Sequence, residues 1–155
     1  MLSPRWLLGG VALVSVAAVF SALALQYHHG MQPCPWCILQ RAIYLAIAGA
    51  ALIALVWRTR VGSRVSATLV ALLAACGAAA ALWQHFVAAS AESCNLTLAE
   101  RIISALTLDE RWPEIFTAYA SCKDAAVNLL GVPFEFWSLA LFVAIGAAAI
   151  SAWRG

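Results

Sequence analysis

The motif Cys34-Pro-Trp-Cys37 places two thiols at a spacing that suits thiol–disulfide chemistry. Proline is favoured in the first turn of a helix, so Cys34 is predicted to cap a helix that begins at Pro35. Both sulfurs then lie beside unpaired N–H groups and the positive end of the helix dipole, which favour thiolate over thiol. A static disulfide here would close almost no loop and would stabilise the fold little, so the motif indicates a reactive pair.

Arg41 lies four residues after Cys37 and is predicted to share its helix face. An arginine inside an apolar segment is costly, and a permanent cation beside a thiolate is a function that would explain it. The alternative is that the Arg41 side chain extends to the membrane interface and takes no part in the chemistry.

Three further cysteines follow in the chain. Cys94 and Cys122 are 28 positions apart, so a disulfide between them would close a long loop and could serve stability alone. The natural pairs are Cys34–Cys37 and Cys94–Cys122, although four cysteines allow three connectivities. Cys76 lies within an apolar, alanine-rich run and is expected to be a small residue at a helix-packing face.

Zinc binding is an alternative use of the motif, because His28 and His29 precede Cys34 by a few residues. Adjacent histidines do not point the same way on a helix, and zinc needs reduced thiols. We therefore expect no metal site.

The amino-acid composition indicates the kind of protein that carries these thiols. Of 155 residues, 65% are hydrophobic and 10% are charged, against about 45–50% and 25% in ordinary globular proteins. So few charges cannot cover the surface of a soluble domain, and a net charge of +2 does not indicate nucleic acid binding. The sequence predicts one integral membrane domain over residues 1–155.

Four apolar segments are long enough to cross a bilayer as helices, and none shows the alternation of a β-barrel strand. They cover about 7–26, 35–57, 65–86 and 133–153. The predicted fold is an all-α bundle of four transmembrane helices with a long outer loop over 87–132. Ala22-x-Ala24 resembles a signal-peptidase site, but the apolar run is longer than a typical signal segment, so the first span is expected to remain.

Within the loop, Thr97-x-x-Glu100 has the pattern of a capping box and predicts a short helix. Ile102, Ile103 and Leu106 fall on one side of this helix, so it either lies flat on the membrane surface or packs on the spans.

Basic residues mark one side of the membrane and acids the other. Arginines lie before the first span, between the second and third, and after the fourth, whereas six acids lie in 87–132. Positive loops stay in the cytoplasm, so both termini are predicted to be cytoplasmic and the loop to face outward. The outward side of a bacterial membrane is oxidising, and disulfides persist there.

The chain resembles the DsbB family of disulfide bond formation proteins. The resemblance is carried by the run Gln32-Pro-Cys-Pro-Trp-Cys-Ile-Leu-Gln-Arg41, by Cys94 and Cys122, and by Leu129-Leu-Gly-Val-Pro133. It implies a thiol oxidase of the bacterial inner membrane that reoxidises a periplasmic, thioredoxin-like dithiol oxidase of the DsbA type. It further implies that the electrons pass to a membrane quinone, which supports disulfide bond formation.

The family's functional residues can be placed on this chain through the same motifs. The resemblance implies that Cys94 takes the mixed disulfide with the partner, that Cys122 attacks Cys34, and that Cys37 passes electrons to the quinone beside Arg41. His85 falls where the family has a histidine near the quinone, although an interfacial histidine without a role is the alternative. Ubiquinone is favoured over menaquinone.

Two other readings remain. A thiol–quinone oxidoreductase of the vitamin K epoxide reductase type is also a four-helix relay, but it has its CxxC motif late and its loop cysteines early, the reverse of the order here. A zinc-binding or purely structural membrane protein is the alternative without enzymatic activity.

Overall fold

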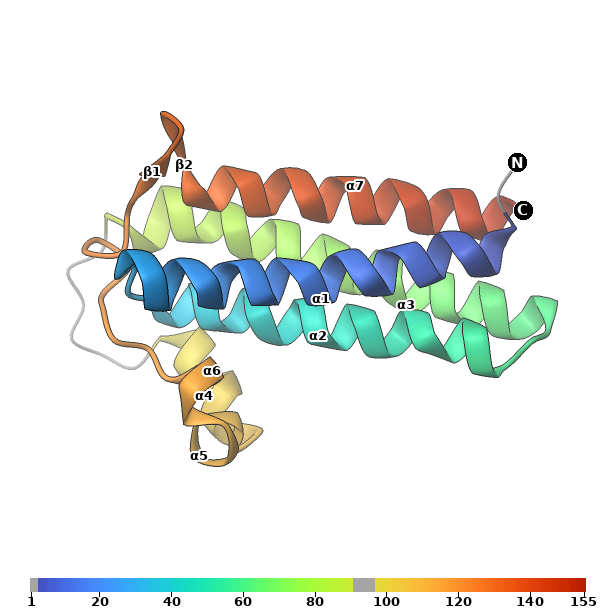
Figure 1. Cartoon of the computed structure of the whole chain (residues 1–155), viewed down its shortest axis with the longest axis horizontal. Coiled ribbons are helices and arrows are strands. Elements are labelled where there is room, and N and C mark those ends of the chain that lie inside the picture. The colour runs from blue at the N-terminus through green and yellow to red at the C-terminus, as the bar shows by residue number, and fades with distance from the viewer. Residues whose placement is uncertain (1–2, 91–96) are drawn as a thin grey trace.

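The computed structural model describes residues 3–90 and 97–155. Four long helices lie side by side and form a bundle, as Figure 1 shows. They are α1 (Pro4–His29), α2 (Pro35–Val56), α3 (Arg60–Trp83) and α7 (Phe134–Arg154). Each is long and apolar enough to cross a membrane, where α3 is counted together with the π-helical turn Gln84–Ala88 that extends it. The predicted four-helix membrane bundle is confirmed.

Local signals set the ends of these helices. Gly30 ends α1 in the left-handed conformation (φ 63°), which glycine adopts without strain. Cys34 is the N-cap of α2, as predicted, and its sulfur accepts a bond from the Cys37 amide at 3.4 Å. The third helix begins at Arg60, five residues before the predicted start, because Thr59 caps it by accepting a bond from the Gly62 amide at 3.0 Å.

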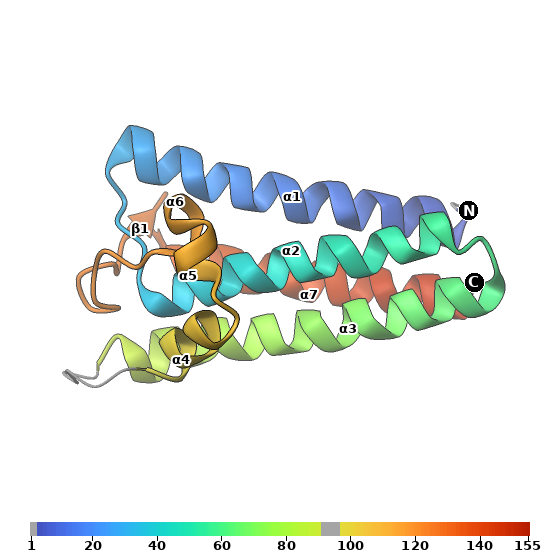
Figure 2. The ribbon, with the colours of Figure 1, turned by 90° about the horizontal axis from the view of Figure 1, so that it is seen from below.

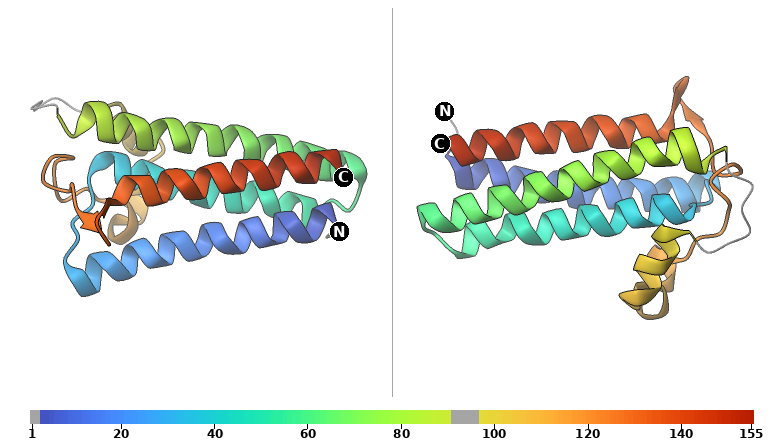
Figure 3. Two further views of the ribbon diagram at one scale, coloured as in Figure 1. Left: turned by 90° about the horizontal axis from the view of Figure 1, so that it is seen from above. Right: turned by 180° about the vertical axis from the view of Figure 1, so that it is seen from behind.

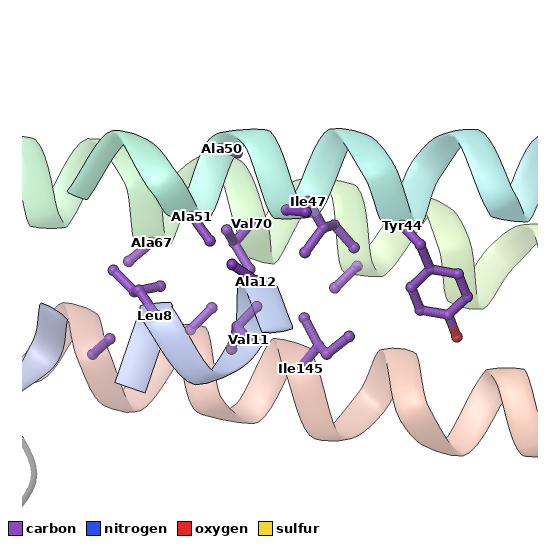
Figure 4. Packing of buried hydrophobic residues seen from close by; sticks show 14 of the residues in the cluster. Leu8, Val11, Ala12, Tyr44, Ile47, Ala50, Ala51, Ala67, Val70 and Ile145 are labelled. Atoms are coloured by element: carbon purple, nitrogen blue, oxygen red, sulfur yellow. The ribbon is translucent and has the colours of Figure 1, made fainter. Parts of the chain in front are cut away.

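The bundle core is built from small and branched residues on the facing sides of the helices. Figure 4 shows Leu8 and Val11 of α1, Ile47 of α2, Val70 of α3 and Ile145 of α7 meeting in its centre. Toward one end of this core the Tyr44 ring stacks on the buried Phe142 ring, with centroids 4.2 Å apart and planes 7° apart. Gly77 of α3 lies directly against the Phe142 ring, where no side chain would fit.

Both termini and the α2–α3 turn lie at one end of the bundle, here called the termini end (Figures 1 and 3). There the Arg5 guanidinium donates to the Arg58 carbonyl at 2.7 Å. From this end α1 and α2 separate progressively toward the opposite end, here called the loop end, as Figure 2 shows. At the loop end a cavity lies between α1, α2 and α7.

The loop between α3 and α7 forms three short helices that project from one side of the loop end (Figure 1). They are α4 (Leu98–Ala105), α5 (Leu108–Arg111) and α6 (Pro113–Phe116). The capping box is confirmed, because the Glu100 amide donates to Thr97 Oγ1 at 3.2 Å and the Thr97 amide to Glu100 Oε2 at 2.6 Å. Buried Ala99 and Ile103 pack α4 against the bundle beside α2, one of the two predicted arrangements.

A two-stranded antiparallel hairpin leads from the loop into α7. Its strands are β1 (Asn128–Leu129) and β2 (Val132–Pro133), and both turn residues, Leu130 (φ 54°) and Gly131 (φ 82°), have positive φ. The hairpin places the start of α7 at the loop end.

Candidate active site

Three cysteine sulfurs follow one another at the start of α2, with Cys34 in contact with each of the other two. Cys34 is fully buried, and its sulfur lies 3.0 Å from that of half-buried Cys37. The closeness of the two sulfurs follows from the motif, because an N-cap residue and the third residue of the helix face each other across the first turn.

The third sulfur comes from the loop. Cys122 is buried and its side chain is hydrogen-bonded to that of Cys34. The loop is held in place because the Pro33 carbonyl accepts bonds from the Tyr119 amide at 3.0 Å and the Ala120 amide at 3.3 Å. The bond from Cys34 lowers the pKa of the Cys122 thiol, since it stabilises a thiolate there.

Cys94 and Cys76 are the remaining cysteines. Cys94 lies outside the described residues. Cys76 is exposed on α3, so the expectation that it packs between helices is wrong. The alanines around it supply the close-packing face instead, with Ala74 and Gly77 buried.

A cavity of about 580 Å³ opens between α1, α2 and α7 at the loop end, and we call it the loop-end cavity. The Cys37 side chain is part of its wall. Most of the lining is apolar, including Leu25, Leu141 and Ala144. The polar or charged side chains that line it from the membrane helices are Ser21, Gln40, Arg41, Tyr44, Gln84, Glu135 and Ser138.

Arg41 lines the same cavity as Cys37 and is only 6% exposed. Its Nη1 donates to Gln26 Oε1 at 2.8 Å and to the Ile115 carbonyl at 3.0 Å. The side chain therefore does not extend to the interface. It places a buried cation at the cavity and ties α2 to α1 and to the loop.

Two glutamines that the sequence analysis missed support the Cys37 sulfur. Gln84 Nε2 donates to Cys37 Sγ at 3.3 Å, and Gln40 Nε2 donates to Gln84 Oε1 at 2.8 Å. Both side chains are buried. The signal was available, because polar residues inside otherwise apolar spans are rare and usually functional.

His85 is not among the residues that line the loop-end cavity. It lies on the π-helical turn, and its Nδ1 is 2.6 Å from Glu135 Oε1. Glu135, in the first turn of α7, does line the cavity. The Glu135 carboxylate thus lies between His85 and the cavity. In the sequence, the signal for this contact was an acidic residue inside an apolar span.

A second hollow of about 1110 Å³ lies on another face of α2, and we call it the loop-side groove. Its lining includes Trp36, Trp83, Thr97 and Cys122. Cys122 is therefore reached from a different side of α2 than Cys37.

Comparison with known proteins identifies the family of the chain. The family model "Disulfide bond formation protein DsbB" matches residues 4–152. The chain belongs to the DsbB family. It is 33% identical to disulfide bond formation protein B of Nitrosomonas europaea over 93% of this chain and 90% of the relative. Over 98% of this chain and 94% of the relative it is 32% identical to the protein of that name from Stutzerimonas stutzeri.

Membership of the DsbB family makes the chain a multi-pass membrane oxidoreductase of disulfide bond formation. Assignment to the DsbB family takes the place of the vitamin K epoxide reductase alternative. For the metal-binding alternative, no three His, Cys, Asp or Glu side chains gather as a possible metal site within residues 3–90 and 97–155. His28 and His29, which suggested zinc, are exposed at the end of α1.

Proposed function

We propose that this chain reoxidises a periplasmic, thioredoxin-like dithiol oxidase and passes the electrons through its own cysteines to a membrane quinone. The observation that carries the proposal is the order of the sulfurs. The Cys122 thiol is hydrogen-bonded to Cys34, the Cys34 sulfur contacts that of Cys37, and Cys37 borders the loop-end cavity.

The contacts support one direction of exchange. The partner's dithiol reduces the Cys94–Cys122 disulfide through a mixed disulfide at Cys94, and this frees the Cys122 thiolate. Because Cys122 contacts Cys34, it attacks the Cys34 sulfur of a Cys34–Cys37 disulfide, and Cys37 leaves as a thiolate. The partner's second thiol then breaks the mixed disulfide, and the oxidised partner leaves Cys94 as a thiolate. Attack of Cys94 on the Cys122 sulfur breaks the Cys34–Cys122 disulfide, restores the loop pair and leaves Cys34 and Cys37 as a dithiol.

The leaving thiolate at Cys37 is stabilised where it forms. Gln84 donates a hydrogen bond to its sulfur, and the buried guanidinium of Arg41 lines the same cavity. Charge-assisted contacts of this kind are strong in a medium of low polarity. They favour attack at Cys34 over attack at Cys37.

The residues around the loop-end cavity fit a quinone. Its volume lies within the usual 300–1,000 Å³ of small-molecule sites, with an apolar lining and a few polar groups. Arg41, Tyr44 and Gln40 are the side chains that would hold the quinone carbonyls. A bound quinone supplies a two-electron, two-proton acceptor, and ubiquinone is the proposed species, with menaquinone as the alternative.

The proposed location is the bacterial inner membrane, with both termini cytoplasmic and the loop end periplasmic. The arginines at the termini end and the acids of the loop support this orientation. The loop cysteines then face the compartment in which disulfides persist.

The test is a coupled assay with the purified full chain, a reduced DsbA-type partner and either decylubiquinone or a menaquinone analogue. We expect loss of quinone absorbance and oxidation of the partner in equal amounts. Cys37→Ala abolishes quinone reduction but still allows a Cys34–Cys122 disulfide, detected by mass spectrometry. Cys76→Ala is the matched control and keeps full activity.

Two results would overturn the proposal. One is a wild-type protein that oxidises the partner without reducing either quinone. The other is normal quinone reduction by Cys37→Ala. Stoichiometric zinc in the active preparation would support the metal-binding alternative instead.

A further inference from the structure

Glu135 and His85 form a pair at the loop end that the sulfur relay does not use. Glu135 Oε1 lies 2.6 Å from His85 Nδ1, and within the described part of the chain this carboxylate has no other hydrogen-bond partner. The carboxylate side chain is 6% exposed and the imidazole 31%. A buried carboxylate in a membrane span is costly, so its retention needs a reason.

A structural role is the simpler explanation. An acid in the first turn of a helix is favoured by the helix dipole, and the bond to His85 would join α7 to the end of α3. That role does not require Glu135 to face the loop-end cavity. Glu135 does line this cavity, whereas His85 does not, so the pair crosses the wall between the cavity and the protein surface.

Among the groups that line the cavity, Glu135 is the one suited to exchange a proton. Arg41 faces it from α2 but keeps its proton at all physiological pH values. The Tyr44 hydroxyl, also on α2, is already hydrogen-bonded to Ser138. The Cys37 thiol takes part in the redox step itself. The lining residues of α1 carry no charged or titratable side chain.

We propose that Glu135 and His85 are a proton relay that delivers a proton from the outer surface to a quinone oxygen in the loop-end cavity. This inference rests on the proposed function. His85 takes a proton from water on Nε2 and passes the Nδ1 proton to the Glu135 carboxylate. The carboxylic acid then donates that proton into the cavity, and exchange with water returns the imidazole to its first tautomer.

The balance of the reaction is complete. Oxidation of the Cys34–Cys37 dithiol to a disulfide releases two electrons and two protons, and reduction of a quinone to a quinol consumes the same numbers. Both electrons pass from the dithiol. One dithiol proton accompanies them, the other is released to water at the loop end, and the relay replaces it.

The test compares Glu135→Gln with wild type in a single turnover of the reduced full chain with decylubiquinone. Glutamine keeps the shape and a hydrogen bond to His85 but cannot carry a proton. We expect quinol formation to slow by about 100-fold, the lower range for general acid catalysis, with the quinone dissociation constant unchanged. Added formate, a small acid that can enter the cavity, restores the rate in part.

A second readout needs no quinone. Nitrogen NMR of the His85 ring should show a hydrogen-bonded Nδ1–H in wild type and a changed tautomer population in Glu135→Gln. The exposed acid Glu110 provides the matched control, and Glu110→Gln should behave as wild type in both experiments. If Glu135→Gln does not fold, His85→Gln takes its place, with rescue by imidazole.

The relay is overturned if Glu135→Gln forms quinol at the wild-type rate. It is also overturned if quinol formation is slow, quinone affinity is reduced and added formate has no effect. The last result would leave only a positioning role. Identical His85 spectra in the two proteins would also overturn it. Failure of the proposed function is distinct, because the wild type itself would then form no quinol.

Discussion

The contact between Gly77 and Phe142 allows a sharp test of how the bundle supports the loop-end cavity. A β-carbon at position 77 would overlap the Phe142 ring, which is 1% exposed and cannot move into free space. Overpacking of this kind costs about 1–3 kcal/mol. For a chain of this size that corresponds to a fall in Tm of about 2–12 °C in Gly77→Ala.

The displacement should also reach the site. The Phe142 ring stacks on the Tyr44 ring, and Tyr44 lines the loop-end cavity, so a shifted Phe142 changes the shape of its wall. We expect Gly77→Ala to weaken quinone binding as well as to lower Tm. Thermal unfolding in detergent micelles gives the first quantity, and quenching of tryptophan fluorescence on titration with decylubiquinone gives the second.

Gly49→Ala is the matched control, because nothing lies within 4 Å of its added β-carbon and alanine favours a helix. Its Tm should equal or exceed that of wild type. Combining Gly77→Ala with Phe142→Leu makes room for the methyl group, so the double variant should lose less stability than the two single losses together. Equal Tm values for Gly77→Ala and Gly49→Ala would refute the reasoning.

Three further predictions concern the loop and its attachment. Because the pKa of the Cys122 thiol is lowered, its thiolate is present at lower pH than that of an ordinary cysteine. Alkylation of Cys122 in the reduced protein should therefore begin at lower pH. Cys34→Ala should shift this pH dependence of alkylation to higher pH. Thr97→Val removes the cap of α4 at a cost of about 0.5–2 kcal/mol, which faster hydrogen exchange confined to α4 would report. Arg41→Gln removes charged hydrogen bonds worth about 1.5–3 kcal/mol each. Amide hydrogen exchange in α6 should therefore become faster, and quinone affinity should fall. Unchanged hydrogen exchange would show that the hydrogen bond to the Ile115 carbonyl does not hold the loop.

Much of the framework could be predicted because it follows from local rules. The spans follow from the lengths of apolar runs, the cap at Cys34 from the proline that follows it, and α4 from its capping box. The start of α3 was placed too late, because hydropathy registers apolar residues whereas Thr59 begins the helix through a polar cap.

The cavity and its polar lining could not be predicted in the same way. They depend on how α1 separates from α2 and on which helix faces meet, and both are set by packing between residues distant in sequence. Gln84 and Glu135 are hydrogen-bonded to partners on other helices, and neither partner can be identified from spacing alone. A polar residue in a span shows that a site exists but not which neighbour it serves.

The two hollows on different faces of α2 have a kinetic consequence. The loop-side groove is lined by Cys122 and the loop-end cavity by Cys37, so the proposed electron donor and the proposed electron acceptor would approach the sulfur chain from separate sides. Neither has to depart before the other arrives. Because the reduced cysteines carry the electrons between the two sides, initial rates measured while both are varied should give the parallel double-reciprocal lines of a two-site substituted-enzyme mechanism. Excess of either reactant should not inhibit competitively against the other.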